Sequence, residues 1–295
     1  ETSSMTLGRF VRTWRLGCPA LRRFSTAQAS EELVVKRHTD EKEGIVELAM
    51  NRPKARNALG KNLVGMMEET LSELKFDKSV RVVVVRSANP GMFCAGADLK
   101  ERAAMPPEEV GPFVARLRGL VSSISDMPMP VIAAIDGAAL GGGLEMALAC
   151  DLRVASSEAK MGLVETRLAI IPGAGGTQRL PRLVGPAIAK ELIFTARVID
   201  GEEAGRIGLV NKAVPQNDDG DAATSAALAL AQEIIPNGPI GVQMGKLAIN
   251  KGLEVPLESG LAFEQGCYAQ VIPTKDRLEG LAAFREKRKP QYTGE

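Results

Sequence analysis

The sequence is 295 residues long, with 45% hydrophobic and 25% charged residues, and its 37 Lys and Arg nearly balance 36 Asp and Glu. This composition excludes intrinsic disorder and fibrous repeats, and the length suffices for a domain with a substantial core. Because the sequence contains no run of 18 apolar residues, we expect no membrane-spanning helix.

The first 30 residues are basic and rich in Ser and Thr, and Glu1 is their only acidic residue. This pattern is typical of a mitochondrial transit peptide and predicts a matrix protein whose mature chain starts near Ser25. Because the chain begins with Glu1, Met5 is a candidate initiator. Removal of residues 1–24 takes away five Arg and one Glu, so the formal charge moves from +1 to −3. A mildly acidic mature chain has no global field that favours nucleic acid.

Apolar runs at 45–50, 80–85, 131–135 and 152–155 predict strands, and helical spacing at 62–74 and 110–124 predicts helices between them. The run 80–85 is β-branched and almost wholly apolar, as in a strand that is covered on both faces. This alternation predicts an α/β fold with largely parallel strands. We therefore divide the chain into a transit segment (1–30), a core (31–214) and a carboxyl-terminal region (215–295).

The carboxyl-terminal region has a different character, because its pattern predicts four helices and no strand. These helices span 221–235, 239–251, 256–271 and 276–289, and Pro or Gly residues separate them. A strand-free helical region that follows an α/β core is either a packed cap or an oligomerisation module.

The side chains that serve nucleophilic and metal chemistry are scarce. His38 is the single histidine, and the four cysteines (Cys18, Cys94, Cys150 and Cys267) lie far apart without a CxxC motif. This disfavours a histidine-based triad or metal site and predicts free thiols in a reducing compartment. We expect no metal and no cofactor, so that carboxylates and backbone dipoles must supply any catalysis.

Three glycine-containing patches are the candidates for a site: residues 93–100, residues 136–145, and residues 161–165 together with 171–177. In the second patch, three glycines mark the change from a strand to a helix, where backbone N–H groups can approach a ligand and stabilise a developing oxyanion. Glu145 follows in the first helical turn, and Glu165 comes from a separate segment. Such a pair can divide general acid and base roles.

A purely structural interpretation of the same residues stays open. The glycines can form a packing turn, and Glu145 can serve only as a partner of the helix dipole. Neither GxGxxG nor GxxxxGK[ST] is present, which excludes these dinucleotide-binding and P-loop motifs.

Taken in this order, the three patches resemble the crotonase (enoyl-CoA hydratase/isomerase) superfamily, as do Asn51-Arg52-Pro53 and the segment 284–288. The resemblance extends over the chain after the transit segment. It implies a spiral of ββα units with a helical carboxyl-terminal region that forms trimers, commonly stacked as hexamers. The implied substrate is an acyl-CoA thioester, of which coenzyme A is a part.

The resemblance also implies the role of each site residue. The thioester oxygen would lie between the N–H groups of Ala97 and Gly142, with Gly173 near the water. Glu145 would help to activate that water, and Glu165 would protonate C2. Retention of both glutamates favours hydration over isomerisation. The implied contacts to coenzyme A are Lys54, Ala55, Arg56, Ala95, Asp98, Leu99, Lys100, Phe284 and Lys287.

Residues 161–172 and 272–280 resemble the members that hydrate 3-methylglutaconyl-CoA in leucine degradation. The alternative is a general short- or medium-chain enoyl-CoA hydratase, which includes a mitochondrial paralogue of unassigned substrate. Because methylglutaconyl-CoA carries a second carboxylate, a cation is expected near the acyl pocket, and Arg167 is one candidate.

Two interpretations of other classes remain. The same subgroup includes AU-rich RNA-binding proteins, whose lysine-rich helix corresponds to residues 61–78. Here Lys61, Lys75 and Lys78 are present, but Gly65 and the three glutamates at 68, 69 and 73 deplete the basic stripe and weaken the RNA hypothesis. A non-catalytic trimeric scaffold is the other alternative, which the intact glutamates disfavour.

Overall fold

The computed structural model describes residues 31–295, and the predicted transit segment with its processing site lies outside them. A six-stranded sheet has the order β1-β2-β3-β5-β7-β10, and its strands are Leu33–Arg37, Ile45–Met50, Val82–Ser87, Val131–Ile135, Leu152–Ser156 and Lys212–Val214. Only β1 pairs antiparallel within this sheet. The prediction of an α/β fold with largely parallel strands is therefore confirmed.

A second sheet of four short strands was not predicted. Its order is β4-β6-β8-β9, formed by Met92–Cys94, Ala138–Leu140, Lys160–Gly162 and Ile199–Asp200. β4, β6 and β8 each follow a strand of the larger sheet and precede a helix, so the ββα unit repeats along the chain. These strands have two or three residues, too few for a periodic pattern to be recognised in the sequence.

The helices of the core are α1 (Lys61–Leu74), α2 (Leu99–Ala103), α3 (Pro107–Ser125), α4 (Gly142–Ala149), α5 (Gly176–Val184), α6 (Pro186–Thr195) and α7 (Gly201–Arg206). Short 3₁₀ turns are η1 (Asp40–Lys42), η2 (Pro53–Ala55) and η3 (Glu165–Leu168). None of the helices in the described residues is long and apolar enough to cross a membrane.

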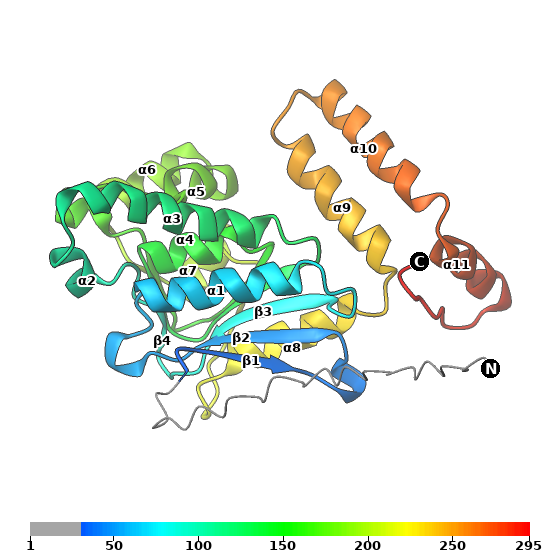
Figure 1. Ribbon diagram of the computed structural model, residues 1–295, viewed down its shortest axis with the longest axis horizontal. Coiled ribbons are helices and arrows are strands. Elements are labelled where there is room, and N and C mark those ends of the chain that lie inside the picture. Colours follow the sequence, from blue (N-terminus) through cyan, green and yellow to red (C-terminus); the bar gives the residue numbers. More distant parts are fainter. Residues whose placement is uncertain (1–30) are drawn as a thin grey trace, which may run out of the picture. The chain divides into compact units, whose positions relative to one another are not determined.

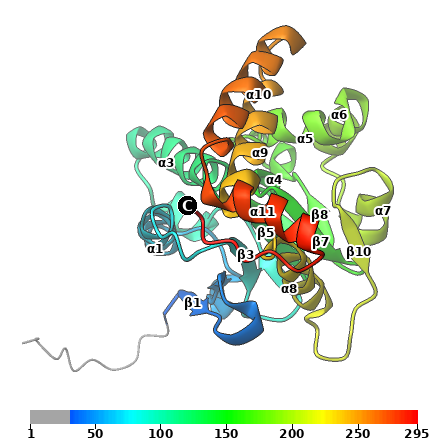
Figure 2. The same ribbon diagram turned by 90° about the vertical axis from the view of Figure 1, so that its right-hand side faces the viewer.

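Strand β3 shows how the large sheet is buried on both faces. Val83 and Val85 belong to the main core with residues of α1 and α3, whereas Val82 and Val84 face the cluster that contains Ala223, Ala227 and Ala231. Those alanines recur every four residues and form one side of α8 (Ala222–Ile234). Figures 1 and 2 show α8 against the sheet, opposite α1 and α4.

The helices after α8 extend beyond the sheet. α9 (Pro239–Gly252) and α10 (Leu257–Val271) form a hairpin, and α11 (Lys275–Glu286) follows it (Figure 1). An ion pair of 2.7 Å between Lys246 Nζ and Asp151 Oδ2 connects α9 to the core. Large apolar side chains of the hairpin are exposed, among them Leu253, Leu257 and Tyr268. Of the four predicted carboxyl-terminal helices, α8 thus covers the core sheet, and the oligomerisation role of this region stays a prediction.

Close packing of α4 on β4 yields a test of the fold. A Cβ atom at Gly143 would lie 2.3 Å from the carbonyl oxygen of Cys94. We expect Gly143→Ala to lower the free energy of unfolding by about 1–3 kcal/mol through overpacking, as measured by urea denaturation followed by circular dichroism. Gly119→Ala is the matched control, because a Cβ there meets no atom within 4 Å. Its higher helix propensity should stabilise α3 by about 0.5–1 kcal/mol. A Gly143→Ala protein as stable as the wild type would contradict the packing argument.

Candidate active site

Two glycine turns bring the predicted N–H donors together. Gly96 lies between β4 and α2 with a φ of +93°, and Gly141 lies between β6 and α4 with a φ of +50°. A Cβ at Gly96 would lie 2.8 Å from the carbonyl oxygen of Leu140, so only glycine permits this approach. A Cβ at Gly142 would lie 3.6 Å from the Ala97 nitrogen. The Ala97 and Gly142 N–H groups therefore lie near one another, and within residues 31–295 neither donates to a backbone carbonyl.

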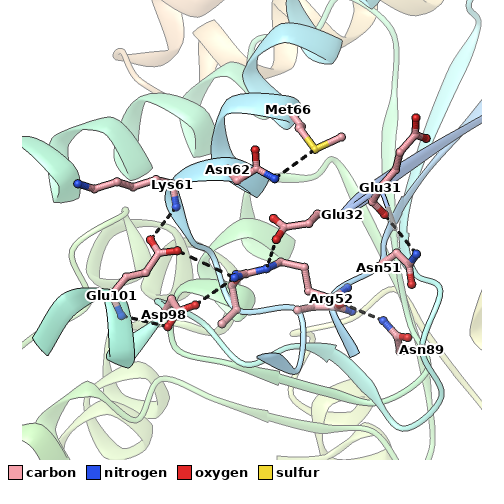
Figure 3. A network of polar contacts seen from close by, with 12 residues as sticks. Glu31, Glu32, Asn51, Arg52, Lys61, Asn62, Met66, Asn89, Asp98 and Glu101 are labelled. Carbon is pink, nitrogen blue, oxygen red and sulfur yellow. Dashed lines mark hydrogen bonds and ion pairs between the residues drawn. The ribbon is translucent and has the colours of Figure 1, made fainter. Parts of the chain in front are cut away.

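The segment that carries Ala97 is held from one side by residues 51–60. Leu59 N donates to Gly96 O at 2.7 Å, and Ala95 N donates to Arg56 O at 3.1 Å. Within residues 51–60, the guanidinium of Arg52 has three carboxylates around it, those of Glu32, Asp98 and Glu101 (Figure 3).

Asp98 has a structural role in the same network. Its side chain accepts hydrogen bonds from the N–H groups of Lys100 and Glu101 and so caps α2. It also forms an ion pair of 3.2 Å with Arg52 Nη2. Asp98 thus connects the loop that carries Ala97 to α2 and to the Arg52 turn.

Glu145 is buried in the first turn of α4, with 3% of its surface exposed. Its Oε1 accepts hydrogen bonds of 2.8 Å from the backbone N–H groups of both Ala174 and Gly176. Burial raises the pKa of Glu145, and these two hydrogen bonds and the charges of Arg179 and Arg118 oppose that increase.

Glu165 begins η3 and has a different environment. Its Oε2 is buried without a hydrogen-bond partner among the described residues, and its Oε1 would be 3.3 Å from a Cβ at Gly141. Burial, together with the negative charge of Glu145, raises the pKa of Glu165 to about 7. Glu165 can therefore hold or release a proton near neutral pH.

A buried cation lies at the other end of α4. Arg153 is 4% exposed, and its guanidinium donates to the carbonyl oxygens of Ala147, Cys150 and Leu209. Ala147 and Cys150 belong to the last turn of α4 and its carboxyl-terminal cap, so Arg153 satisfies carbonyls that the helix leaves unpaired.

A cavity of about 1140 Å³ contains both glutamates. It is lined by these sequence-predicted residues: Ala95, Ala97, Leu99, Gly142, Glu145, Glu165 and Gly173. The remaining predicted contacts to coenzyme A are outside its lining: Lys54, Ala55, Arg56, Asp98, Lys100, Phe284 and Lys287. The structure thus brings the predicted catalytic group together, whereas the contacts outside the lining stay predictions.

Sequence reasoning missed the cations of this cavity, which are Arg102, Arg118, Arg179 and Arg182. The candidate that the sequence indicated, Arg167, instead donates from Nη2 to the carbonyl oxygen of Ala196 at 2.7 Å and is not part of the lining. Nearness to Glu165 in sequence did not place Arg167 at the cavity, because in η3 the side chain of Glu165 lines the cavity whereas that of Arg167 contacts Ala196.

The cysteines of the described chain have no catalytic surroundings. Cys94, Cys150 and Cys267 are free and buried, and burial raises the pKa of Cys94 and Cys150 to about 12. These two therefore stay neutral thiols at physiological pH. No group of three or more His, Cys, Asp or Glu side chains in residues 31–295 is arranged to hold a metal ion.

The chain matches known proteins over most of its length. Residues 40–295 match the enoyl-CoA hydratase/isomerase family model. The chain is 58% identical over 281 residues to methylglutaconyl-CoA hydratase, mitochondrial, from Homo sapiens, covering 95% of this chain and 83% of that protein. It is 60% identical over 263 residues to enoyl-CoA hydratase domain-containing protein 2, mitochondrial, from Mus musculus, covering 89% of each. The crystal structure of enoyl-CoA hydratase from Bacillus anthracis superposes with a TM-score of 0.85 at 46% identity, covering 90% of this chain and all of that one.

The raised pKa of Glu165, whose Oε2 has no hydrogen-bond partner in the described chain, predicts a pH-dependent stability. Its pKa of about 7 in the folded protein exceeds the ordinary value of 4.5, so its stabilising contribution is full below pH 4.5 and is lost as the pH rises through 7. We expect Glu165→Gln to be more stable than the wild type by about 1–2 kcal/mol at pH 8, and equally stable at pH 4.5, in urea denaturation. The exposed Glu69→Gln is the control and should show no such difference between the two pH values. Equal stability of Glu165→Gln and the wild type at pH 8 would contradict this assignment.

Proposed function

The chain belongs to the enoyl-CoA hydratase/isomerase family, and on that premise we propose that it hydrates 3-methylglutaconyl-CoA with Glu145 and Glu165 as the catalytic pair. It is an enoyl-CoA hydratase, and the reaction adds water across the C2–C3 double bond of the thioester. The observation that carries the assignment of the pair is the convergence of a buried carboxylate, Glu145, a half-buried one, Glu165, and two N–H donors on one cavity.

The Ala97 and Gly142 N–H groups would bind the thioester oxygen at the amino-terminal end of α4. Negative charge develops on this oxygen when water attacks C3, because the electrons of the double bond move towards the carbonyl. Donors that are already in place stabilise that charge without reorganisation, typically by a few kcal/mol each.

The two carboxylates would then divide the proton transfers. Glu145, fixed through Oε1 by two N–H groups, accepts a proton from the attacking water as the bond from oxygen to C3 forms. Glu165, whose raised pKa keeps a proton available near neutral pH, delivers it to C2. Return of a proton from Glu145 to Glu165 through solvent restores both groups.

Two features support the methylglutaconyl thioester over a simple enoyl chain. The chain is 58% identical to a human protein named for that substrate, and four arginines line the cavity. A second carboxylate on the acyl group would find a cation there. The general enoyl-CoA hydratase remains the alternative, since a relative at 60% identity is named only for an enoyl-CoA hydratase domain and not for methylglutaconyl-CoA.

Members of this family act on acyl-CoA and commonly form oligomers. We propose a trimer or hexamer, for which the exposed apolar side chains of α9, α10 and α11 supply a surface. Phe284 and Lys287 do not line the cavity of their own chain, and we propose that a neighbouring copy brings them to the coenzyme A. The relatives are named as mitochondrial, and we propose the matrix as the location.

The RNA hypothesis has no support from a specific contact. Lys61 opens α1 and forms an ion pair of 3.3 Å with Glu109, and Glu68 on the same helix binds Arg116. Within this part of the structure the basic side chains share their surface with acidic ones. RNA binding therefore stays an untested prediction from the sequence.

Substrate preference is the first test. We expect the purified protein to remove the conjugated thioester absorbance of 3-methylglutaconyl-CoA with a kcat/KM about tenfold or more above that for crotonyl-CoA, because charge-assisted hydrogen bonds reward the extra carboxylate. A preference for crotonyl-CoA would move the protein to general enoyl-CoA hydration. No turnover of either thioester by folded protein would contradict the hydratase assignment.

The roles of the glutamates are tested on whichever thioester is turned over. Glu145→Gln and Glu165→Gln should each lower kcat by about 10²- to 10⁴-fold, since each removes a proton-transfer group, with KM changed only a few-fold. Glu254→Gln is the matched control: its carboxylate also lines the cavity, but its side chain is 61% exposed and lies 3.9 Å from Arg182. A Gln variant at 145 or 165 that retained wild-type kcat would remove that residue from the mechanism.

A further inference from the structure

One face of α3 forms a wall of the cavity. Val114, Leu117, Arg118 and Ser122 line it, and their offsets of three, four and eight residues from Val114 place them on one side of the helix. This wall offers two apolar side chains, one cation and one hydroxyl. A single helix face therefore presents both a surface for an alkyl group and a partner for an anion.

Arg118 is fixed next to the catalytic carboxylate. Its Nε donates to the carbonyl oxygen of Gly173 at 3.0 Å. The next residue is Ala174, whose N–H donates to Glu145 Oε1 at 2.8 Å. The guanidinium and Glu145 thus bind consecutive residues of one loop. Within residues 31–295, the terminal Nη1 and Nη2 groups of Arg118 donate to no protein acceptor, so these two donors are free for a ligand.

Two other arginines of the cavity donate to protein acceptors through their terminal nitrogens. Arg179 donates to the Ala174 carbonyl at 3.2 Å and to Ser125 Oγ at 3.3 Å. Arg182 donates to the carbonyl oxygen of Gln178 at 2.9 Å.

Arg102 remains unpaired within the described chain, but its position differs from that of Arg118. It belongs to α2, which starts two residues after Ala97, and within residues 31–295 its side chain makes no hydrogen bond to the loop that holds Glu145. Arg118 binds the loop that also holds Glu145. If water held by Glu145 attacks C3, as the proposed function requires, the arm of the acyl group that extends from C3 would lie on the side of Arg118.

We propose that Arg118 is the specificity-determining residue of this site and binds the distal carboxylate of a glutaconyl-type acyl-CoA. In such a substrate the carboxylate lies two bonds beyond C3, and an arginine with two free terminal amino groups matches it bidentately. Val114 and Leu117, on the same helix face, would pack against the methyl branch at C3. This inference rests on the proposed function, because it assumes hydration at this cavity.

The exposure of Arg118 limits the kind of selectivity that it can give. Its side chain is accessible to solvent, so a substrate without the second carboxylate leaves the guanidinium hydrated, with no large penalty. Arg118 therefore rewards the dicarboxylic thioester and does not exclude the monocarboxylic one. Crotonyl-CoA is expected to remain a slower substrate of the wild type.

The test compares substrates that differ in the distal carboxylate, so that losses common to both cancel in a ratio. The quantity measured is kcat/KM for 3-methylglutaconyl-CoA divided by kcat/KM for 3-methylcrotonyl-CoA. Arg118→Met should lower this ratio about 10- to 100-fold, the value of a charge-assisted bidentate contact. Arg118→Lys should retain part of this ratio, because lysine keeps the positive charge but lacks the paired donors of a guanidinium. Arg102→Met, which also removes a cavity cation, should change the ratio less than about threefold.

A second measurement separates binding from turnover. Glutaryl-CoA and butyryl-CoA lack the double bond and differ in the distal carboxylate, so their inhibition constants against crotonyl-CoA hydration report recognition alone. We expect glutaryl-CoA to inhibit the wild type more strongly than butyryl-CoA, and Arg118→Met to abolish that difference.

The outcomes distinguish the two proposals. If the wild type prefers the dicarboxylic ligands and Arg118→Met keeps that preference within threefold, or if Arg102→Met loses it to the same extent, the assignment of Arg118 is overturned while the proposed substrate stands. If the wild type hydrates crotonyl-CoA but shows no preference in either measurement, the dicarboxylic substrate fails and Arg118 with it. If no thioester is hydrated, the reaction itself is wrong.

Discussion

The two hydrogen bonds from Ala174 and Gly176 to Glu145 Oε1 join the separate parts of the cavity. Glu145 belongs to α4, which starts at the glycine turn behind β6, whereas its donors are Ala174, in the loop before α5, and Gly176, the first residue of α5. The same loop binds Arg118 of α3 through Gly173. One buried carboxylate thus fixes the distance between the N–H donors, the proposed water site and the acyl wall.

This arrangement also explains how two residues of one type acquire different chemistry. Glu145 is buried and Glu165 is half-buried, and the loss of solvent raises the pKa of each. Two N–H donors and nearby arginines lower the pKa of Glu145 in turn, whereas Glu165 has a buried oxygen that finds no hydrogen-bond partner in residues 31–295. The differing environments, and not the side chains themselves, separate a group fixed by hydrogen bonds from one that exchanges a proton near neutral pH.

The parts that the sequence predicted are those with a strong local signal. The run of valines in β3 has no polar position and indeed lies between two cores, and the apolar stripe of α1 is buried at Leu63, Met67, Leu71 and Leu74. Glycines beside Glu145 identified the strand-to-helix turn for a similar reason, since few other residues permit it. The order of the motifs then supplied the family, and with it the pairing of Glu145 with Glu165.

The cavity cations could not be predicted in the same way. Helical spacing in α3 shows which side chains face the core, but not that Arg118 meets a loop 55 positions later in the chain. The four-stranded sheet escaped recognition because its strands are too short for an alternating pattern. The contact of Arg118 and the pairing of the short strands both join segments that are distant in sequence. The elements that were predicted correctly depend on residues that are neighbours along the chain.

Arg153 has a consequence for the electric field of the site. α4 has eight residues and is therefore about 12 Å long, so its negative pole lies close enough to offset the positive pole at Gly142. The buried guanidinium covers that negative pole with a full positive charge. The negative pole of α4 would therefore oppose the positive potential at Gly142 less, and this effect comes from a side chain outside the lining of the cavity.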